Sequence, residues 1–123
     1  MEIDANTITV NGIKYVQESS VSEKSETVDG MKYVIVRTYS AGVFAGYLES
    51  RTGQEVVLRN ARRIWYWKGA ASLSQLAQSG TSDPNGCKFP ETVNEITLLQ
   101  AIEIITVTPK AKKIIENVPV WKH

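Results

Sequence analysis

Three runs rich in β-branched and aromatic residues follow one another in the middle of the chain, and they restrict its fold more than any other feature. Residues 31–39 read MKYVIVRTY, and residues 43–48 and 54–67 form the second and third runs. Side chains of these types are typical of β-strands. Short turns containing Gly42 and Gly53 separate the runs, and turns this short join antiparallel neighbours. The sequence therefore predicts a three-stranded antiparallel meander.

The third run does not keep one alternation of apolar residues. Val56 and Leu58 are apolar on one parity, whereas Trp65 and Trp67 are apolar on the other. Successive side chains of a strand point to opposite faces, so either a bulge near Asn60 exchanges the faces or the two halves pack against different parts of the protein. Without a bulge, the strand carries its functional candidates in two sets, with Arg59, Arg63 and Trp65 on one side and Asn60 and Arg62 on the other. Both sets can line one pocket only if a bulge or a second subunit intervenes.

Two short helices are predicted after this run. Residues 72–78 share an apolar face, with Ser72 as the N-cap and Gly80 at the end. Thr108-Pro109 is a start signal for a second helix over residues 110–116.

The rest of the second half favours β-structure. Residues 95–108 fit a helix or a strand, and their β-branched side chains favour two strands that meet near Gln100. Residues 118–121 predict a last short strand, and Gly46 predicts a bulge or a close backbone approach within the second strand. We therefore expect an α+β fold, with a curved antiparallel β-sheet packed around two short helices.

The first 30 residues differ from the rest in composition. Residues 7–16 alternate around Asn11-Gly12, a turn pair of β-hairpins. Residues 17–30 are polar and rich in Ser and Glu, as linkers are. We therefore divide the chain into a hairpin and linker appendage over residues 1–30 and a single domain over residues 31–123.

Charge and the scarcity of catalytic side chains exclude several classes of protein. The chain has 14 basic and 13 acidic residues, with a net charge of +1, which does not fit a general DNA-binding protein. Cys87 is the only cysteine and His123 the only histidine, so we expect no hydrolytic triad, no metal site and no cofactor. No secretory signal and no run of roughly 18 apolar residues is found. We expect a cytoplasmic protein that does not associate with membranes.

Residues 56–82 concentrate the basic charge of the chain. This segment has three Arg, one Lys and no acidic residue, so its charge is +4 (3 + 1 − 0). The guanidinium fork of arginine suits a phosphate, and the rings of Trp65, Tyr66 and Trp67 suit a nucleobase. The combination indicates a nucleotide site. The alternative is that the tryptophans belong to the core and the arginines are solvated or paired with acids.

The same region carries a resemblance to a known family. The run over residues 37–77 and above all NARRIWYWKGA at residues 60–70 resemble the Thoeris anti-defence proteins of the first type, a phage family formerly catalogued as a domain of unknown function. Residues 87–89 and 101–105 and the terminal Val120-Trp121 extend the resemblance to roughly residues 31–122.

The resemblance implies a nucleotide sponge that is not an enzyme. Such proteins bind the glycocyclic ADP-ribose signals of Thoeris without cleaving them, and similar members bind cyclic di- or trinucleotides of the CBASS defence system. They assemble as homodimers and larger oligomers, including hexamers built as trimers of dimers, with pockets shared between chains.

The residues that we expect to bind such a ligand are of three kinds. The phosphate candidates are Arg62, Arg63 and Arg59; the stacking candidates are Trp65, Trp67, Tyr39, Phe44 and Phe89; and the candidates for ribose or base edges are Asn60, Asn94 and Ser40. Two alternatives remain open at this point. One is an enzyme that degrades the same nucleotides with Glu95 or Glu103 as base, and the other is a phage protein whose Arg-Trp segment docks another protein.

Overall fold

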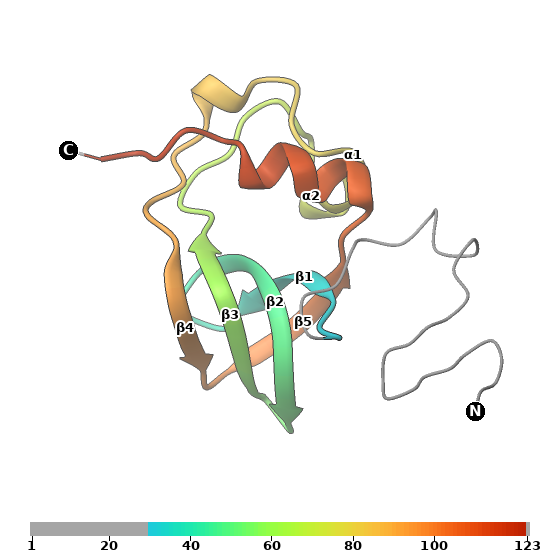
Figure 1. Ribbon diagram of the computed structural model, residues 1–123, viewed down its shortest axis with the longest axis vertical. Coiled ribbons are helices and arrows are strands. Elements are labelled where there is room, and N and C mark those ends of the chain that lie inside the picture. Colours follow the sequence, from blue (N-terminus) through green and yellow to red (C-terminus); the bar gives the residue numbers. More distant parts are fainter. Residues whose placement is uncertain (1–29, 123) are drawn as a thin grey trace, which may run out of the picture.

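The computed structural model describes residues 30–122, which form a five-stranded antiparallel sheet and two α-helices (Figure 1). The strands pair in the order β4-β3-β2-β1-β5. The elements are, in chain order, β1 (Tyr33–Thr38), β2 (Val43–Thr52), β3 (Glu55–Arg63), α1 (Leu73–Ser79), the short 3-10 helix η2 (Pro84–Gly86), β4 (Val93–Leu98), β5 (Ala101–Thr106) and α2 (Pro109–Glu116). The expected α+β fold and the meander β1-β2-β3 are confirmed.

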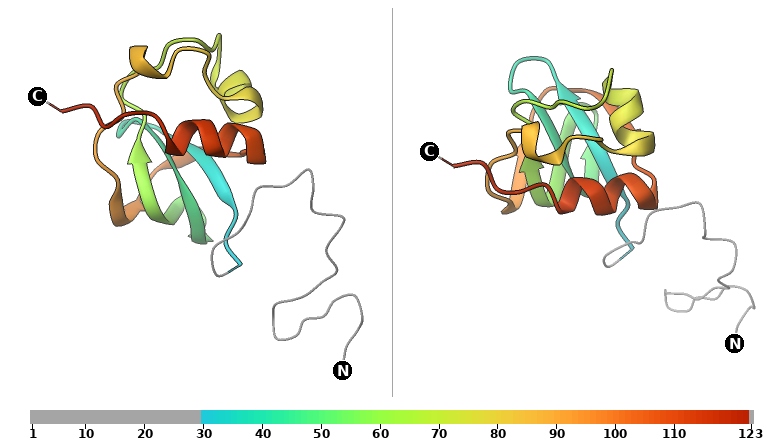
Figure 2. Two further views of the ribbon diagram at one scale, coloured as in Figure 1. Left: turned by 45° about the horizontal axis from the view of Figure 1, so that its top comes forward. Right: turned by 90° about the horizontal axis from the view of Figure 1, so that it is seen from above.

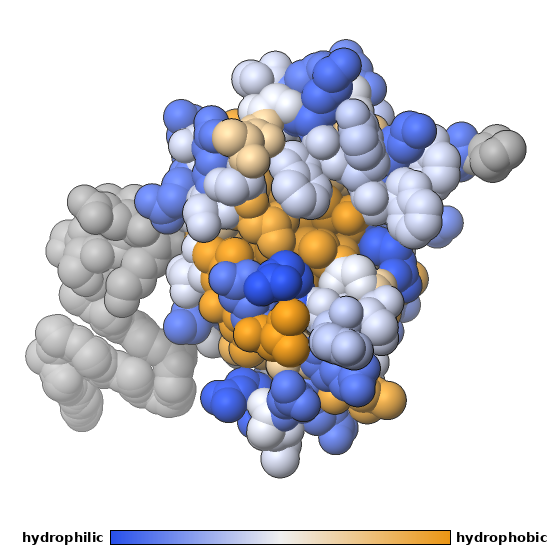
Figure 3. All heavy atoms as spheres, turned by 180° about the vertical axis from the view of Figure 1, so that it is seen from behind, coloured by the Kyte–Doolittle hydropathy of each residue, from blue (hydrophilic) through white to orange (hydrophobic). Residues whose placement is uncertain are grey.

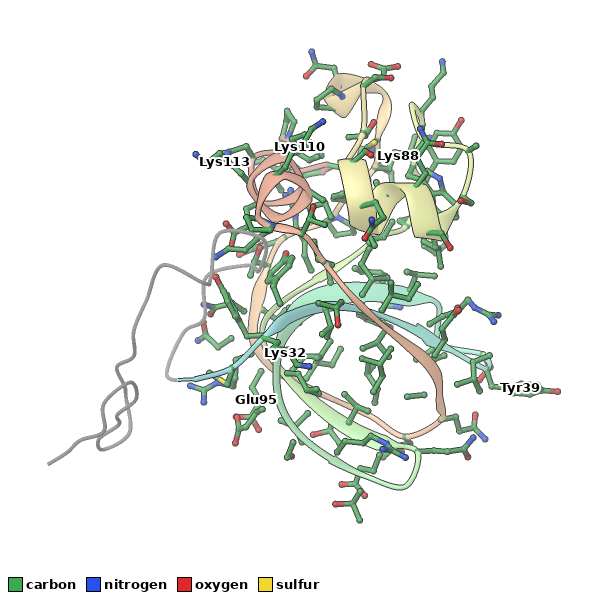
Figure 4. The ribbon with its side chains drawn as sticks, turned by 90° about the vertical axis from the view of Figure 1, so that its right-hand side faces the viewer. Lys32, Tyr39, Lys88, Glu95, Lys110 and Lys113 are labelled. Atoms are coloured by element: carbon green, nitrogen blue, oxygen red, sulfur yellow. The ribbon has the colours of Figure 1, made fainter. Side chains whose placement is uncertain are left out.

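The sheet is strongly curled. β4 and β5 lie at its two opposite edges, yet only Leu99 and Gln100 connect them. A connection of two residues spans only about 10 Å, so the two edges must approach each other at this end. Figure 4 shows the resulting open ring of strands. The predicted division of residues 95–108 into two strands that meet near Gln100 is confirmed.

Both faces of the curled sheet are apolar. Successive residues of β1 face opposite sides of the sheet, and the residues on each side belong to an apolar cluster. Tyr33 and Ile35 pack on the outer face, which α1 and α2 cover (Figure 2). Val34 and Val36 pack inside the curl, with Phe44 and the inward residues of β3 and β4. Complete burial of such side chains stabilises a fold by about 1.5–3 kcal/mol each. Some apolar side chains still reach the surface in the middle of the side opposite Figure 1 (Figure 3).

The two helices begin where the sequence predicts. The Ser72 hydroxyl accepts a hydrogen bond from the Gln75 N–H at 3.2 Å, and the Thr108 hydroxyl accepts one from the Ala111 N–H at 3.1 Å. Each bond satisfies one of the backbone donors that the first turn of a helix leaves unpaired.

A bulge at Asn60 exchanges the faces of β3. Tyr47 pairs with Arg59 and Ala45 with Arg62, so Asn60 and Ala61 together oppose the single residue Gly46. Asn60 has a φ of 49°, in the left-handed region. A Cβ on Gly46 would lie 3.1 Å from the Ala61 Cα and from the Arg59 carbonyl oxygen. The predicted bulge and the predicted close approach at Gly46 are both confirmed.

Two expected strands are shorter in the structure. β3 ends at Arg63, so Trp65 and Trp67 follow the strand and do not belong to it. The expected strand over 118–121 is a single bridge between Phe89 and Val120, and Pro119 in this segment has no N–H to donate to a longer ladder. The expected hairpin over 7–16 and most of the linker over 17–30 lie outside the described residues.

Candidate functional site

A pocket of about 300 Å³ opens between two turns at one end of the curled sheet. We call it the turn pocket. Its walls come from the β1–β2 turn, from the β4–β5 turn and from the adjoining ends of β2, β3 and β4. The wall includes Thr38, Ser40, Ala41, Phe44, Arg63, Thr97 and Gln100. Three of the residues predicted from the sequence, Ser40, Phe44 and Arg63, therefore meet in one pocket.

Arg63 is the cation of the turn pocket. Its Cζ lies 4.4 Å from the centroid of the Phe44 ring, and its Nη1 donates a hydrogen bond to the Ala41 carbonyl oxygen at 2.6 Å. Among the described residues, no carboxylate pairs with this guanidinium, whose Nε–Nη2 edge has no partner there either. That edge presents two parallel N–H groups, the arrangement in which arginine binds phosphate or carboxylate.

Hydrogen bonds tie the two turns of the pocket together. The Tyr39 N–H donates to the Gln100 carbonyl oxygen at 2.9 Å, and the Ser40 hydroxyl donates to Gln100 Oε1 at 3.4 Å. These bonds fix the two turns relative to each other, and the rim of the pocket carries hydroxyl and amide groups. Such groups suit ribose hydroxyls or base edges.

Two large apolar side chains lie exposed at the rim. Tyr39 is 76% exposed and Leu99 is 70% exposed. Figure 4 shows Tyr39 extending away from the sheet into solvent. Tyr39 is therefore placed beside the turn pocket, where it can cover a ligand or a neighbouring chain but does not line the wall.

Arg62 and Phe89 lie in the core beneath α2. Arg62 is 3% exposed, and its guanidinium donates to the carbonyl oxygens of Phe89, Pro90 and Ile115 at 3.1–3.2 Å. Burial lowers the pKa of Arg62 from its usual value. Phe89 is fully buried and lies under the same guanidinium at 5.5 Å. The structure gives both residues a packing role and places them away from the turn pocket.

Arg59, the third phosphate candidate, is separated from Arg63 by the bulge. Val56 and Leu58 face the inside of the curl before the bulge, and Ala61 faces it afterwards. Arg59 consequently lies on the outer face, where its Nη1 contacts Glu49 Oε1 at 3.1 Å. Arg59 and Arg63 would share a face only in a strand without a bulge.

The other predicted residues lie outside the turn pocket. Asn60 borders a separate hollow of about 250 Å³ with Tyr33, Arg62, Thr92 and Glu116. Asn94 is exposed on β4. Trp65 is 64% exposed, whereas Trp67 packs against the outer core and donates from Nε1 to the Ala70 carbonyl oxygen at 3.1 Å.

A cluster around Lys88 was missed by the sequence argument. The Lys88 Nζ lies 5.7 Å from the ring centroids of both Tyr66 and Trp121. Backbone hydrogen bonds link the three segments, because the Lys88 N–H donates to the Tyr66 carbonyl oxygen and the Trp121 N–H donates to that of Phe89. Segments this far apart in sequence give no local signal of their contact.

Two further hollows are less suited to a nucleotide. One of about 460 Å³ lies beside β5 and has Arg51 and Glu103 but no aromatic ring in its wall. The other, of about 320 Å³, lies along α2 and has Lys110, Lys113 and Glu116 in its wall (Figure 4). Unlike the turn pocket, the hollow along α2 has neither an aromatic ring for a base nor an arginine in its wall.

Residues 30–122 contain no helix that is long and apolar enough to cross a membrane. Nor do they bring three His, Cys, Asp or Glu side chains together as a metal site would require. The buried Cys87 thiol contacts Thr81 and the backbone of Lys68 and Asp83.

Among the comparisons with known proteins, only the family models give a match. No curated protein and no solved structure matches the chain. A family model described as a domain of unknown function, DUF6948, matches residues 31–115, which include all five strands and most of α2. The chain therefore belongs to the DUF6948 family.

Proposed function

We propose that this protein is a nucleotide sponge that binds a cyclic nucleotide immune signal in the turn pocket and sequesters it without degrading it. One contact carries the proposal: Arg63 lies on the Phe44 ring with its Nε–Nη2 edge directed to no described partner, in a pocket that already exists. That edge is suited to a phosphate of the ligand. Glycocyclic ADP-ribose is the first ligand to test, because the sequence resembles the Thoeris anti-defence family, and cyclic di- and trinucleotides come next.

The size of the pocket supports a shared site. A volume of about 300 Å³ is at the lower end of the range for small-molecule pockets, so one nucleotide unit fits and the rest of a cyclic nucleotide extends past the rim. Tyr39 and Leu99 are exposed at that rim. We propose that a second copy of the chain packs there, and that the protein is a homodimer or a larger oligomer.

Binding without turnover is supported by the state of the acidic candidates. Glu103 is held by Arg37 at 2.8 Å, and Glu95 is an exposed residue of β4 paired in register with Arg59. Neither lines the turn pocket. A base must come within hydrogen-bond reach of the proton that it removes, and neither glutamate is placed to reach a ligand on Arg63.

Sequestration demands high affinity. A dissociation constant near 1 nM corresponds to about −12 kcal/mol. A preformed pocket reduces the entropy lost on binding, and the cross-linked turns described above provide one. The sponge would act in the cytoplasm of a bacterial host, where the signal is made.

Calorimetric titration of the full chain with glycocyclic ADP-ribose tests this function. The complex is then denatured by heat, and the released ligand is analysed by chromatography. The sponge requires tight binding and intact ligand. Consumed ligand would establish an enzyme, and the absence of binding to glycocyclic ADP-ribose and to cyclic di- and trinucleotides would reject the nucleotide function.

A second candidate function rests on the aromatic side chains near Lys88. Trp65, Tyr66 and Trp121 are at least one-third exposed, and exposed aromatic groups are enriched in protein interfaces. A phage protein that docks a protein partner would use this surface. Co-purification of a defined partner that Trp65→Ala releases, together with no nucleotide binding, would favour it.

A further inference from the structure

Thr38 is a buried polar residue at the base of the β1–β2 turn. It is 6% exposed, and its hydroxyl donates to the Gly42 carbonyl oxygen at 2.7 Å while accepting from the Ala41 N–H at 2.9 Å. Its own N–H also donates to the Gly42 carbonyl oxygen, at 3.0 Å. Three hydrogen bonds of one residue therefore close the turn.

The closed turn fixes the carbonyl group that holds Arg63. The Ala41 N–H is bound by Thr38, and the Ala41 carbonyl oxygen accepts from Arg63 Nη1 at 2.6 Å. Gly42 has a φ of 105°, which residues with a side chain rarely adopt, and a Cβ there would lie 3.6 Å from Arg63 Nη1. The turn is thus built to bring a backbone carbonyl against this guanidinium.

The orientation of Arg63 follows from these contacts. The Phe44 ring lies 4.4 Å from the guanidinium carbon, and the Ala41 carbonyl oxygen accepts one hydrogen bond from Nη1. Within residues 30–122 nothing bonds to the Nε–Nη2 edge, which is therefore available to a ligand. An arginine that is already held loses less side-chain entropy when it binds, and a wrongly turned guanidinium cannot make two parallel bonds to one phosphate.

We infer that Thr38 is a positioning residue of the turn pocket, which acts through Ala41 to present the Nε–Nη2 edge of Arg63 to a phosphate of the ligand. This inference rests on the proposed function, because a phosphate is the group that Arg63 is expected to bind there. It goes beyond that function because it attributes the orientation of the Arg63 guanidinium to the Thr38 hydroxyl, which lies on another strand.

A double-mutant cycle with glycocyclic ADP-ribose tests the inference. Thr38→Val has the same shape as threonine but no hydroxyl, and Thr38→Ser keeps the hydroxyl. We expect Thr38→Val to raise the dissociation constant about tenfold, Thr38→Ser to change it less than about twofold, and Thr38→Val to have almost no effect in an Arg63→Ala background. An equal loss with and without Arg63 would show a merely structural role and overturn the inference.

A measurement without ligand separates this inference from the proposed function. Nitrogen-15 NMR of the Arg63 side chain, assigned with Arg63→Lys, reports rotation of the guanidinium. We expect separate Nη signals in the wild type and in Thr38→Ser, and averaged signals in Thr38→Val. Identical spectra of the wild type and Thr38→Val would overturn the inference. Distinct spectra in a protein that binds no nucleotide would instead reject the proposed function alone.

Discussion

Arg63 and Phe44 face each other across β3 and β2, with the guanidinium carbon 4.4 Å from the ring centroid. Phe44 is almost fully buried, and Arg63 lies over it at the wall of the turn pocket. The ring stabilises the cation by a cation–π contact at the pocket wall. The proposed binding site and the inner core therefore meet in this pair.

Phe44→Leu is expected to weaken nucleotide binding because it removes the ring beneath Arg63. A cation–π contact is worth about 0.5–2 kcal/mol, so the dissociation constant should rise about 2- to 30-fold. Calorimetric titration measures the change. Phe89→Leu is the matched control, since it removes a buried ring that lies under Arg62 and outside the pocket. Equal losses of affinity in the two variants would contradict the assignment.

Arg62→Leu is expected to destabilise the fold strongly. The substitution leaves three buried carbonyl oxygens, those of Phe89, Pro90 and Ile115, without their donor. The free energy of unfolding should fall by about 2–4 kcal/mol, as measured by urea denaturation. Arg59→Ala removes an exposed ion pair with Glu49 and should cost less than about 1 kcal/mol. A mild effect at Arg62 would show that the carbonyl groups find other donors.

Tyr33 is expected to make stability fall at alkaline pH. Burial, with Glu116 as a second cause, raises the pKa of this phenol above its usual value near 10. The folded state therefore keeps the proton after the unfolded state has lost it, so the contribution of Tyr33 is complete below about pH 10 and is lost as the pH rises from there toward the folded pKa. Tyr33→Phe should flatten the unfolding free energy between pH 9 and 11, relative to an exposed control, Tyr39→Phe. Parallel pH profiles of the two variants would refute this.

Gly46→Ala is expected to disturb the bulge of β3. The added methyl group would lie 3.1 Å from two backbone atoms, the Ala61 Cα and the Arg59 carbonyl oxygen, neither of which moves as freely as a side-chain end. Overpacking of this kind costs about 1–3 kcal/mol, so the melting temperature should drop by several degrees. An unchanged melting temperature would mean that β2 and β3 can separate at this point without loss.

The fold was largely predictable because its signals are local. Ser72 and Thr108 cap their helices through atoms three residues away, and the break in alternation around Asn60 marked the bulge. The curl was predictable only in outline. The short connection between β4 and β5 can be seen in the sequence. The placement of these two strands at opposite edges cannot, because it depends on the pairing of β4 with β3 and of β5 with β1.

The site was predictable in part for the same reason. Ser40 and Phe44 belong to the β1–β2 hairpin, and Arg63 lies on β3, which pairs with β2, so the three residues are close together. Sequence alone could not distinguish Arg62 from Arg63, because the difference between a buried guanidinium and a pocket wall depends on carbonyl groups 27 to 53 residues away. The contacts of Lys88 with Tyr66 and Trp121 are likewise long-range.

The most direct test of the central claim is the affinity of Arg63→Ala for glycocyclic ADP-ribose, measured beside the wild type and Arg59→Ala at one salt concentration. A charge-assisted bidentate phosphate contact is worth about 1.5–3 kcal/mol or more, so Arg63→Ala should raise the dissociation constant at least about tenfold, while Arg59→Ala should leave it almost unchanged. Wild-type affinity in Arg63→Ala would contradict the account, because the turn pocket would then not be the place where the nucleotide binds.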